Sequence, residues 1–335
     1  MHAALNSPDP PQAMERGAHD ELVARSPQGS VFANSWWLDA VAGERWRTHL
    51  VERNGETVAA WPTVVQPSRW GDVHEGAPLT PFLGPIFAPD ESRHRRISRE
   101  IEYLEELLEL MGPFAHLQAR CDPAFEYWTP LRWHGFTQTT HYTWRLVDLS
   151  DLEQVFAALR ENVRREIRKA RKRGLAVEEA SVDEYLPLHR SSAARQEREA
   201  EARANEELLR RIDVAAGERG ARTILVARDP EGVAHSAGFY VHDERFTYYL
   251  AGGSSGEHLG SGAASLVMWE AIERAAGRGT SFDFEGSMIR EVERFVRSFG
   301  GAPAPYSIVR STPSAAFGSE RAVRRVAAIA FRKFR

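Results

Sequence analysis

The chain has 335 residues, 42% of them hydrophobic and 27% charged, a composition that indicates a soluble globular protein with room for two domains. Its formal net charge of −4 argues against a general nucleic-acid coat protein, and we expect no DNA partner. The single cysteine, Cys121, excludes an internal disulfide and a thiolate zinc cluster. We therefore predict no metal and a reducing, cytoplasmic location, with no segment long enough to span a membrane.

Residues 1–20 carry prolines and charges but lack the apolar core of a signal peptide, so a disordered or frayed start is predicted. A first domain over residues 21–148 follows. Its dipeptide Asn54-Gly55, between two β-prone runs, is a strong hairpin signal. The elements expected in this domain are helices at 35–42 and 91–111 and strands at 49–53, 56–65, 115–120 and 142–147.

A second domain is expected over residues 149–313. Ser150 and Glu153 have the spacing of a capping box, so a helix should begin at Asp151. The end of this helix, residues 160–173, holds eight basic and two acidic residues, a net charge of +6. Such a surface is either a solvated helix end or a binding site for a polyanion. The elements expected after it are strands at 176–179, 223–228, 233–241, 245–251 and 281–284, and a mostly helical stretch at 182–217.

Residues 314–335 form a predicted basic C-terminal helix with one apolar side. Three alternatives remain for it: docking on its own domain, contact with tRNA, or peripheral contact with an anionic membrane surface. The sequence leaves the oligomeric state open.

Residues 245–300 carry the strongest functional pattern. An aromatic strand ends at the glycine-rich run 252–256, and apolar residues from Gly262 onward recur at helical spacing. A strand, a glycine turn and a helix leave free backbone N–H groups at the helix N-terminus, where they can hold an anionic group. The stretch therefore predicts a site for an anionic donor.

The motif Glu257-x-x-Gly260-x-Gly262-Ala263 resembles the pyrophosphate loop of GNAT acyltransferases, in which Gln or Arg usually stands at the first position. The resemblance implies that Gly260, Ser261 and Gly262 bind the donor. The longer run containing FDFEGSM, VERF and SFGG is similar to the FemAB-like branch, whose best known members transfer an amino acid from aminoacyl-tRNA to a peptide amine. The implied fold is α/β (α+β), with two tandem GNAT-like domains, each a mixed, mostly antiparallel sheet flanked by helices.

The same resemblance implies further binding residues. FemAB-like proteins carry a basic helix beside the acceptor cleft, and here this implies Arg164, Lys169 and Lys172 as the cations that meet phosphate or carboxylate. Tyr248 stands where these proteins have a cleft tyrosine, with a packed strand aromatic as the alternative.

Fem transferases place a lysine, after a phenylalanine, whose charge supports the reacting carbonyl or the tRNA end. The corresponding position here is Val296, so the resemblance departs from the family pattern at this point. We predict that Phe295 keeps its place and that Arg294 or Arg297 supplies the cation from a neighbouring position.

Acyl transfer to an amine needs a deprotonated amine and hydrogen-bond donors for the oxyanion. No Ser-His-Asp or Cys-His arrangement is visible, which favours direct attack without a covalent enzyme intermediate. Glu285 is the predicted proton acceptor or amine-orienting group, and Ser287 beside it a substrate-binding group. For Asp283, a structural role that holds the loop is the alternative.

Three hypotheses follow. The first is an aminoacyltransferase that moves an amino acid from aminoacyl-tRNA to an amine of a peptidoglycan precursor or a peptide-like metabolite, with no tightly bound cofactor. The second is an acyl-CoA-dependent N-acyltransferase, and the third a non-catalytic binding protein derived from the GNAT fold. The basic helix and the tandem pattern favour the first.

Overall fold

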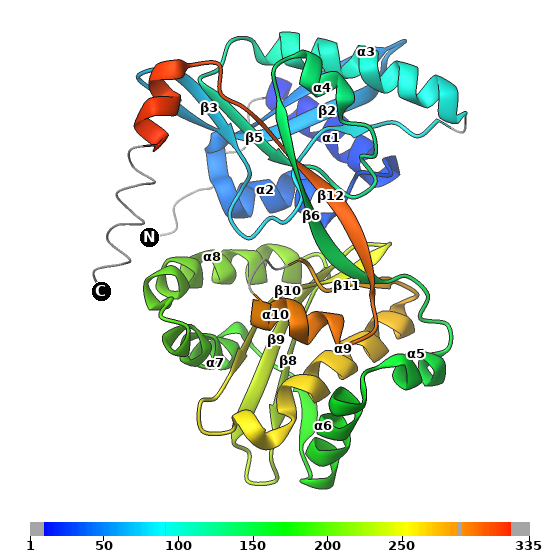
Figure 1. Ribbon diagram of the computed structural model, residues 1–335, viewed down its shortest axis with the longest axis vertical. Helices are drawn as coiled ribbons and strands as arrows, with labels where there is room; N and C mark the ends of the chain where they lie inside the picture. The colour runs from blue at the N-terminus through cyan, green and yellow to red at the C-terminus, as the bar shows by residue number, and fades with distance from the viewer. Residues whose placement is uncertain (1–9, 91, 287–289, 323–335) are drawn as a thin grey trace. The chain divides into compact units, whose positions relative to one another are not determined.

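The computed structural model describes residues 10–90, 92–286 and 290–322 (Figure 1). The chain forms two compact units: unit 1 comprises Met1–Thr140 and Tyr306–Arg335, and unit 2 comprises His141–Pro305. The chain passes from one unit to the other inside two strands, β6 (Thr137–Leu146) and β12 (Ala302–Ser311). The units divide at 140/141 and 305/306, whereas the domains were expected to divide at 148/149 and 313/314.

Unit 1 is built around the strand order β1-β2-β3-β5-β12, and β4 pairs with β2. Neighbouring strands are antiparallel except for β3 and β5, which are parallel and are joined through helix α3. Asn54 and Gly55 take the positive φ angles of 53° and 81° that a tight hairpin turn requires. The elements are α1 (Pro10–Arg25), α2 (Ser35–Ala42), β1 (Trp46–Arg53), β2 (Glu56–Ser68), β3 (Gly71–Glu75), β4 (Ile86–Phe87), α3 (Arg93–Met111), β5 (His116–Arg120) and α4 (Thr129–Trp133).

The start of unit 1 corrects one expectation. Residues 10–20, expected to be frayed, belong to helix α1, while residues 1–9 lie outside the described part of the chain. The helix is held by burial of Leu22 and Val23 in a small core with Ala60 of β2, and by His19, whose Nε2 lies 2.7 Å from the Ala33 carbonyl. Tertiary packing thus stabilises a helix whose sequence alone has little amphipathic character.

Unit 2 has the strand order β6-β11-β10-β9-β8-β7. Here too one neighbouring pair is parallel, β10 with β11, and it is joined through a helix, α9. The remaining elements are α5 (Leu152–Ala158), α6 (Glu161–Lys172), β7 (Ala176–Glu179), α7 (Val182–Arg195), α8 (Glu199–Gly217), β8 (Arg222–Arg228), β9 (Ala234–His242), β10 (Phe246–Ser254), η3 (Leu259–Ser261), α9 (Ala263–Arg278), β11 (Ser281–Asp283) and α10 (Arg290–Arg297).

The two units repeat one order of elements. The series β1-β2-β3-α3-β5-α4-β6 in the first half corresponds to β8-β9-β10-α9-β11-α10-β12 in the second. The last strand of each series crosses into the other unit, where β6 pairs with β11 and β12 pairs with β5. The expected α/β fold, two tandem domains with mixed and mostly antiparallel sheets, is confirmed.

Helices cover both faces of the unit 2 strands (Figure 1). Helices α7 and α8 pack on one face, where Tyr185 meets Phe239 of β9. Helices α6 and α9 pack on the other, around a core that includes Ile167 and Ile272. Residues 151–173, expected as one helix, form α5 and α6, because Leu159 is extended and the N–H of Arg160 bonds to the Ser298 carbonyl at 3.0 Å. None of the described helices combines the length and apolarity needed to cross a membrane.

Candidate active site

Strand β10 separates from its neighbour β11 halfway along its length. The two strands pair only from Phe246 to Tyr248 in the described residues, whereas β9 stays paired with β10 as far as Ser254. A register shift between Tyr249 and Ala251 follows immediately after the last β11 pair. The second half of β10 therefore presents backbone groups that do not pair with β11, and the N–H groups among them are suitable donors for an oxyanion.

The end of β11 is fixed by Asp283, which is fully buried. Its carboxylate accepts hydrogen bonds from the Thr143 hydroxyl, from Arg145 Nε at 2.7 Å and from the Glu285 N–H at 2.8 Å. Arg145 also lies over the ring of Phe246, with its guanidinium 4.4 Å from the ring centroid. With its oxygens engaged in this way, Asp283 holds the turn that follows it, in agreement with the structural alternative.

Glu285 turns the chain away from β10. Its φ angle of 51° lies in the left-handed region that non-glycine residues rarely occupy, a form of local strain that often accompanies functional sites. The next residue must be small, since a Cβ atom on Gly286 would lie 1.9 Å from the Tyr142 carbonyl oxygen. Burial, together with the charge of the half-buried Glu285, raises the pKa of Tyr249 on β10 to about 12. The Glu285 carboxylate is therefore close to the part of β10 that is not paired with β11.

The predicted donor-binding glycines differ in their surroundings. Gly262 has a φ of 86° and a Cβ atom there would lie 2.2 Å from the Glu166 carbonyl oxygen of α6, so helix packing requires glycine. Gly260 is exposed and has open space where a Cβ would be. Ser261 is buried between them, and its hydroxyl accepts a hydrogen bond from the N–H of Ala263 at the start of α9.

The structure brings the basic helix α6 against this glycine loop, residues 254–262. Arg173, just after α6, donates from Nη1 to the Gly260 carbonyl at 3.1 Å. Two of the predicted cations are engaged within the helix: Arg164 pairs with Glu161 at 2.7 Å, and Lys169 pairs with Glu166. Lys172 is exposed, and no ion pair holds it among the residues that the structure describes.

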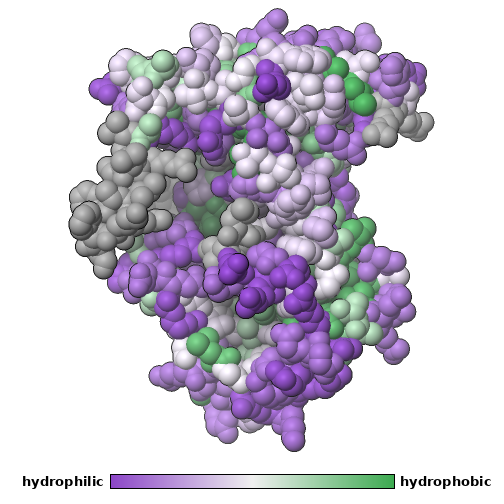
Figure 2. Space-filling model, viewed as in Figure 1, coloured by the Kyte–Doolittle hydropathy of each residue, from purple (hydrophilic) through white to green (hydrophobic). Residues whose placement is uncertain are grey.

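Exposed cations remain on the outer side of α6. Arg165 and Lys172 make no ion pair with any described residue, and Arg168 reaches Glu161 only at 3.8 Å. The surface over α6 is predominantly hydrophilic in Figure 2. The helix thus presents positive charge beside the loop at the N-terminus of α9.

Helix α7 holds the other end of the glycine loop, a contact that sequence analysis missed. The N–H of Ser254 donates to Ser192 Oγ at 2.8 Å, and that of Gly256 donates to Ser191 Oγ at 3.2 Å. Arg195, exposed at the end of α7, donates from Nη1 to the Ser254 carbonyl at 2.9 Å. The sequence offered one signal, Gly253 inside a strand, which marks a close approach of another backbone.

The close approach at Gly253 is made by α7 itself. A Cβ atom on Gly253 would lie 2.4 Å from the backbone N of His189. The His189 ring lies with Nδ1 3.0 Å from the Tyr185 hydroxyl and 3.4 Å from the Gly252 carbonyl oxygen. His189 was not among the residues that the sequence predicted.

The predicted residues of α10 divide between core and surface. Val296, at the position of the Fem lysine, is fully buried in the core of unit 2, with Phe295 packed against the same core. Arg294 is exposed, whereas Arg297 is half-buried and pairs with Glu293 at 2.6 Å. A side chain at position 296 therefore points into the core, and Arg294 is one of the exposed cations of this helix, with Arg290.

Tyr248 and Ser287 are the remaining predicted residues. Tyr248 is 1% exposed, and its hydroxyl donates to Asp243 Oδ2 in the β9–β10 turn at 3.2 Å, so it packs within the sheet toward the hairpin end of β10. Ser287 lies outside the described residues. The described residues contain no group of three potential metal ligands.

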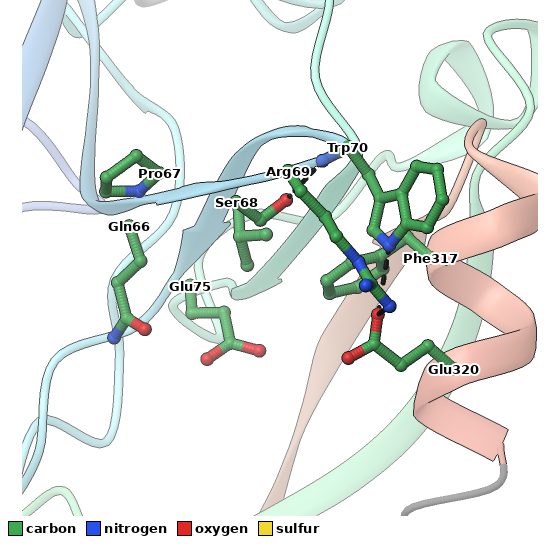
Figure 3. A pocket seen from close by; sticks show the side chains of 9 residues that line it. Gln66, Pro67, Ser68, Arg69, Trp70, Glu75, Phe317 and Glu320 are labelled. Carbon is green, nitrogen blue, oxygen red and sulfur yellow. Dashed lines mark hydrogen bonds and ion pairs between the residues drawn. The ribbon is translucent and has the colours of Figure 1, made fainter.

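A large surface pocket lies elsewhere, wholly within unit 1. It has a volume of about 740 Å³ and is bordered by the β2–β3 hairpin and by Phe317 and Glu320 (Figure 3). Glu320 accepts hydrogen bonds there from Arg69 at 2.8 Å and from Trp70 Nε1 at 2.9 Å. It contains none of the residues predicted for catalysis.

Comparisons with known proteins identify related folds. Residues 157–295 match the family model of the acetyltransferase (GNAT) domain. No curated protein matches the sequence. Among solved structures, FemX has a TM-score of 0.66 at 14% identity and covers 92% of this chain and 96% of its own.

Two other structures share the fold over most of the chain. The C-terminal domain of a putative lysylphosphatidylglycerol synthetase from Agrobacterium fabrum has a TM-score of 0.57 at 14% identity, covering 93% of this chain and 96% of its own. A tandem GNAT protein from the clavulanic acid biosynthesis pathway has a TM-score of 0.52 at 13% identity, covering 89% and 94%.

Residues 157–295 therefore match a GNAT domain, and the chain as a whole shares the fold of a tandem GNAT protein. The chain has the fold of the FemAB-like branch, and the resemblance inferred from the sequence motifs is confirmed.

Proposed function

We propose that the protein is an aminoacyltransferase that forms an amide bond, moving an amino acid from aminoacyl-tRNA to the amine of a peptidoglycan precursor or a peptide-like metabolite. The observation that carries this proposal is the contact between the basic helix α6 and the glycine loop through Arg173 and Gly260. A polynucleotide donor uses positive charge over a long surface, since each contacted phosphate contributes to binding. Exposed Arg165 and Lys172 extend the positive charge beyond the loop.

The donor ester is proposed to lie along the second half of β10. Its carbonyl oxygen would accept hydrogen bonds from the backbone N–H groups of β10 that are not paired with β11. The phosphates of the donor would lie at the N-terminus of α9. Arg195 and Arg173, which hold the two ends of the loop, would add charge there. Glu285 would orient the acceptor amine, and the exposed Arg294 would supply the cation that the Fem lysine supplies in that family.

An acyl-CoA N-acyltransferase is the second candidate. The match of residues 157–295 to an acetyltransferase domain favours it, as does the short glycine loop before α9, which suits a pyrophosphate. A non-catalytic binding protein is the third.

One set of assays separates the three. Purified protein is incubated with a cell-wall precursor and either charged tRNAs or acyl-CoAs, and the amide product is measured by mass spectrometry. We expect product with charged tRNA and its loss after RNase treatment. Product with acyl-CoA alone, together with thermal stabilisation by acetyl-CoA, would establish the second candidate instead.

The Glu285→Gln substitution tests the proposed site. We expect a loss of product of about 100-fold at unchanged thermal stability, since the carboxylate that orients the amine is replaced by a neutral amide of the same shape. Glu244→Gln, at an exposed residue of the β9–β10 turn and outside the proposed site, is the matched control and should keep its activity. Wild-type activity in Glu285→Gln would remove this residue from the mechanism.

A further inference from the structure

The His189 ring is held at the part of β10 that separates from β11. Gly253 allows the α7 backbone to touch the strand, and the His189 ring stacks on Tyr185, with ring centroids 5.5 Å apart. Its Nδ1 lies within reach of two oxygens, the Tyr185 hydroxyl at 3.0 Å and the Gly252 carbonyl at 3.4 Å. Gly252 belongs to the stretch of β10 that extends past its pairing with β11.

The Tyr185 hydroxyl can donate or accept, so we assign the tautomer from the contact with the Gly252 carbonyl. A carbonyl oxygen can only accept, so a proton on Nδ1 lets the ring donate to Gly252 and to Tyr185. The lone pair then resides on Nε2, which makes no hydrogen bond to any residue that the structure describes. The side chain is half-buried, so this nitrogen is fixed in orientation by a strand carbonyl and still open to a ligand.

The surroundings keep the imidazole neutral. Burial lowers the pKa of His189 and outweighs the opposing effects of the Gly252 carbonyl and of Glu206 and Glu201 on α8, while Arg198 lowers it further. Tyr185 on α7 is fully buried, and burial raises the pKa of its phenol, so it carries no charge beside the ring. At neutral pH the ring is therefore able to accept a proton.

We propose that Nε2 of His189 accepts the proton that the acceptor amine loses during acyl transfer. The inference rests on the proposed function and adds to it the group that removes the proton, while Glu285 orients the amine. The geometry points to His189 because it is tied to the same strand segment that holds the donor carbonyl, on the face covered by α7 and α8.

The acyl transfer begins with attack by the amine. The amine lone pair forms a bond to the carbonyl carbon of the donor ester, and the carbonyl oxygen takes up negative charge at the N–H groups of β10. The extra proton of the amine passes to His189 Nε2, which becomes an imidazolium. The carbonyl then re-forms as the C–O bond to the tRNA ribose breaks. The ribose oxygen takes the proton from the His189 imidazolium, and an amide and a neutral His189 remain.

The test compares pH profiles of kcat/KM for the wild type, His189→Gln and His189→Ala. A base whose pKa is lowered is charged, and inactive, only below that pKa, so the wild-type rate should rise with pH on the acid side of neutrality and then level. His189→Gln keeps a donor for the Gly252 carbonyl but accepts no proton. Its kcat should fall about 100-fold, and the rise of the rate with pH below neutrality, the acid limb of the profile, should disappear.

His189→Ala separates chemistry from packing. We expect added imidazole to restore part of its rate, because a free base can enter the space that the ring leaves. His242→Gln, on β9, is the control, and it should keep the wild-type profile; burial lowers the pKa of His242 to about 4. Thermal unfolding of each variant shows that it is folded.

Each outcome is decisive. A wild-type rate and profile in His189→Gln would overturn the role of His189 while leaving the proposed function intact. A rate loss that keeps the acid limb and is not rescued by imidazole would overturn it too, since this indicates a structural role. No product from the wild-type enzyme with any charged tRNA would instead overturn the proposed function and this step with it.

Discussion

Gly260 and Gly262 occupy the same loop and meet opposite constraints. Gly262 sits at the N-terminus of α9 with a φ of 86°, against the backbone of α6. Gly260 is exposed, and its carbonyl oxygen accepts a hydrogen bond from Arg173. Glycine at 262 is thus required by conformation and by packing, and glycine at 260 by neither of them.

Alanine substitution should separate the two positions. Gly262→Ala forces a Cβ to within 2.2 Å of the Glu166 carbonyl oxygen and strains the backbone, so we expect a loss of about 2 kcal/mol or more in the free energy of unfolding. Gly260→Ala should change it by less than about 0.5 kcal/mol. Urea denaturation followed by circular dichroism measures both; equal effects would contradict the packing argument.

At the scale of the element, α6 has a buried apolar side and an exposed basic side. Val163, Ile167 and Ala170 face the core of unit 2, where they pack with α9. Arg165 and Lys172 lie on the exposed side, next to the glycine loop that Arg173 contacts. The helix thus presents exposed positive charge beside the proposed donor site.

Charge reversal on α6 tests this surface. Arg165→Glu with Lys172→Glu should weaken tRNA binding and reduce the slope of log K against log salt by about 1 for each phosphate that the helix no longer neutralises. Arg203→Glu, an exposed position on α8, is the control with the same kind of charge change. Filter binding at several salt concentrations measures the slope, and equal slopes for all variants would exclude α6 from tRNA binding.

At the scale of the whole molecule, each unit has a core of its own. Leu107 is fully buried in the core of unit 1, and Ile272 is fully buried in that of unit 2. The chain connects the units through β6 and β12, each of which completes the sheet of the other unit. Such domains open locally with free energies set by their own packing.

Hydrogen exchange should report this separation. Ile272→Ala removes buried methylenes at a cost of about 2–5 kcal/mol and should speed amide exchange in β8, β9 and β10, with little change in β1 and β2. Leu107→Ala should have the converse effect. Mass spectrometry of peptic peptides localises the change, and acceleration spread equally over both units by either variant would show a single cooperative core.

The sequence by itself determined many of the elements and the family resemblance, because periodicity, glycine turns and the loop motif before α9 are local properties of the chain. It missed helix α1 and the division of residues 151–173 into α5 and α6, which depend on tertiary contacts. It offered a structural role for Asp283 as an alternative, and the structure buries this residue.

Only the tertiary structure decided where the units divide and which groups meet at the loop. Pairing of β12 with β5 and of β6 with β11 joins residues far apart in sequence, and no local signal encodes this. The contacts of Arg173 with Gly260 and of His189 with Gly252 depend in the same way on long-range packing. The site is therefore assembled by two helices, α6 and α7, that are brought against one strand and its loop by the cores on the two faces of the sheet.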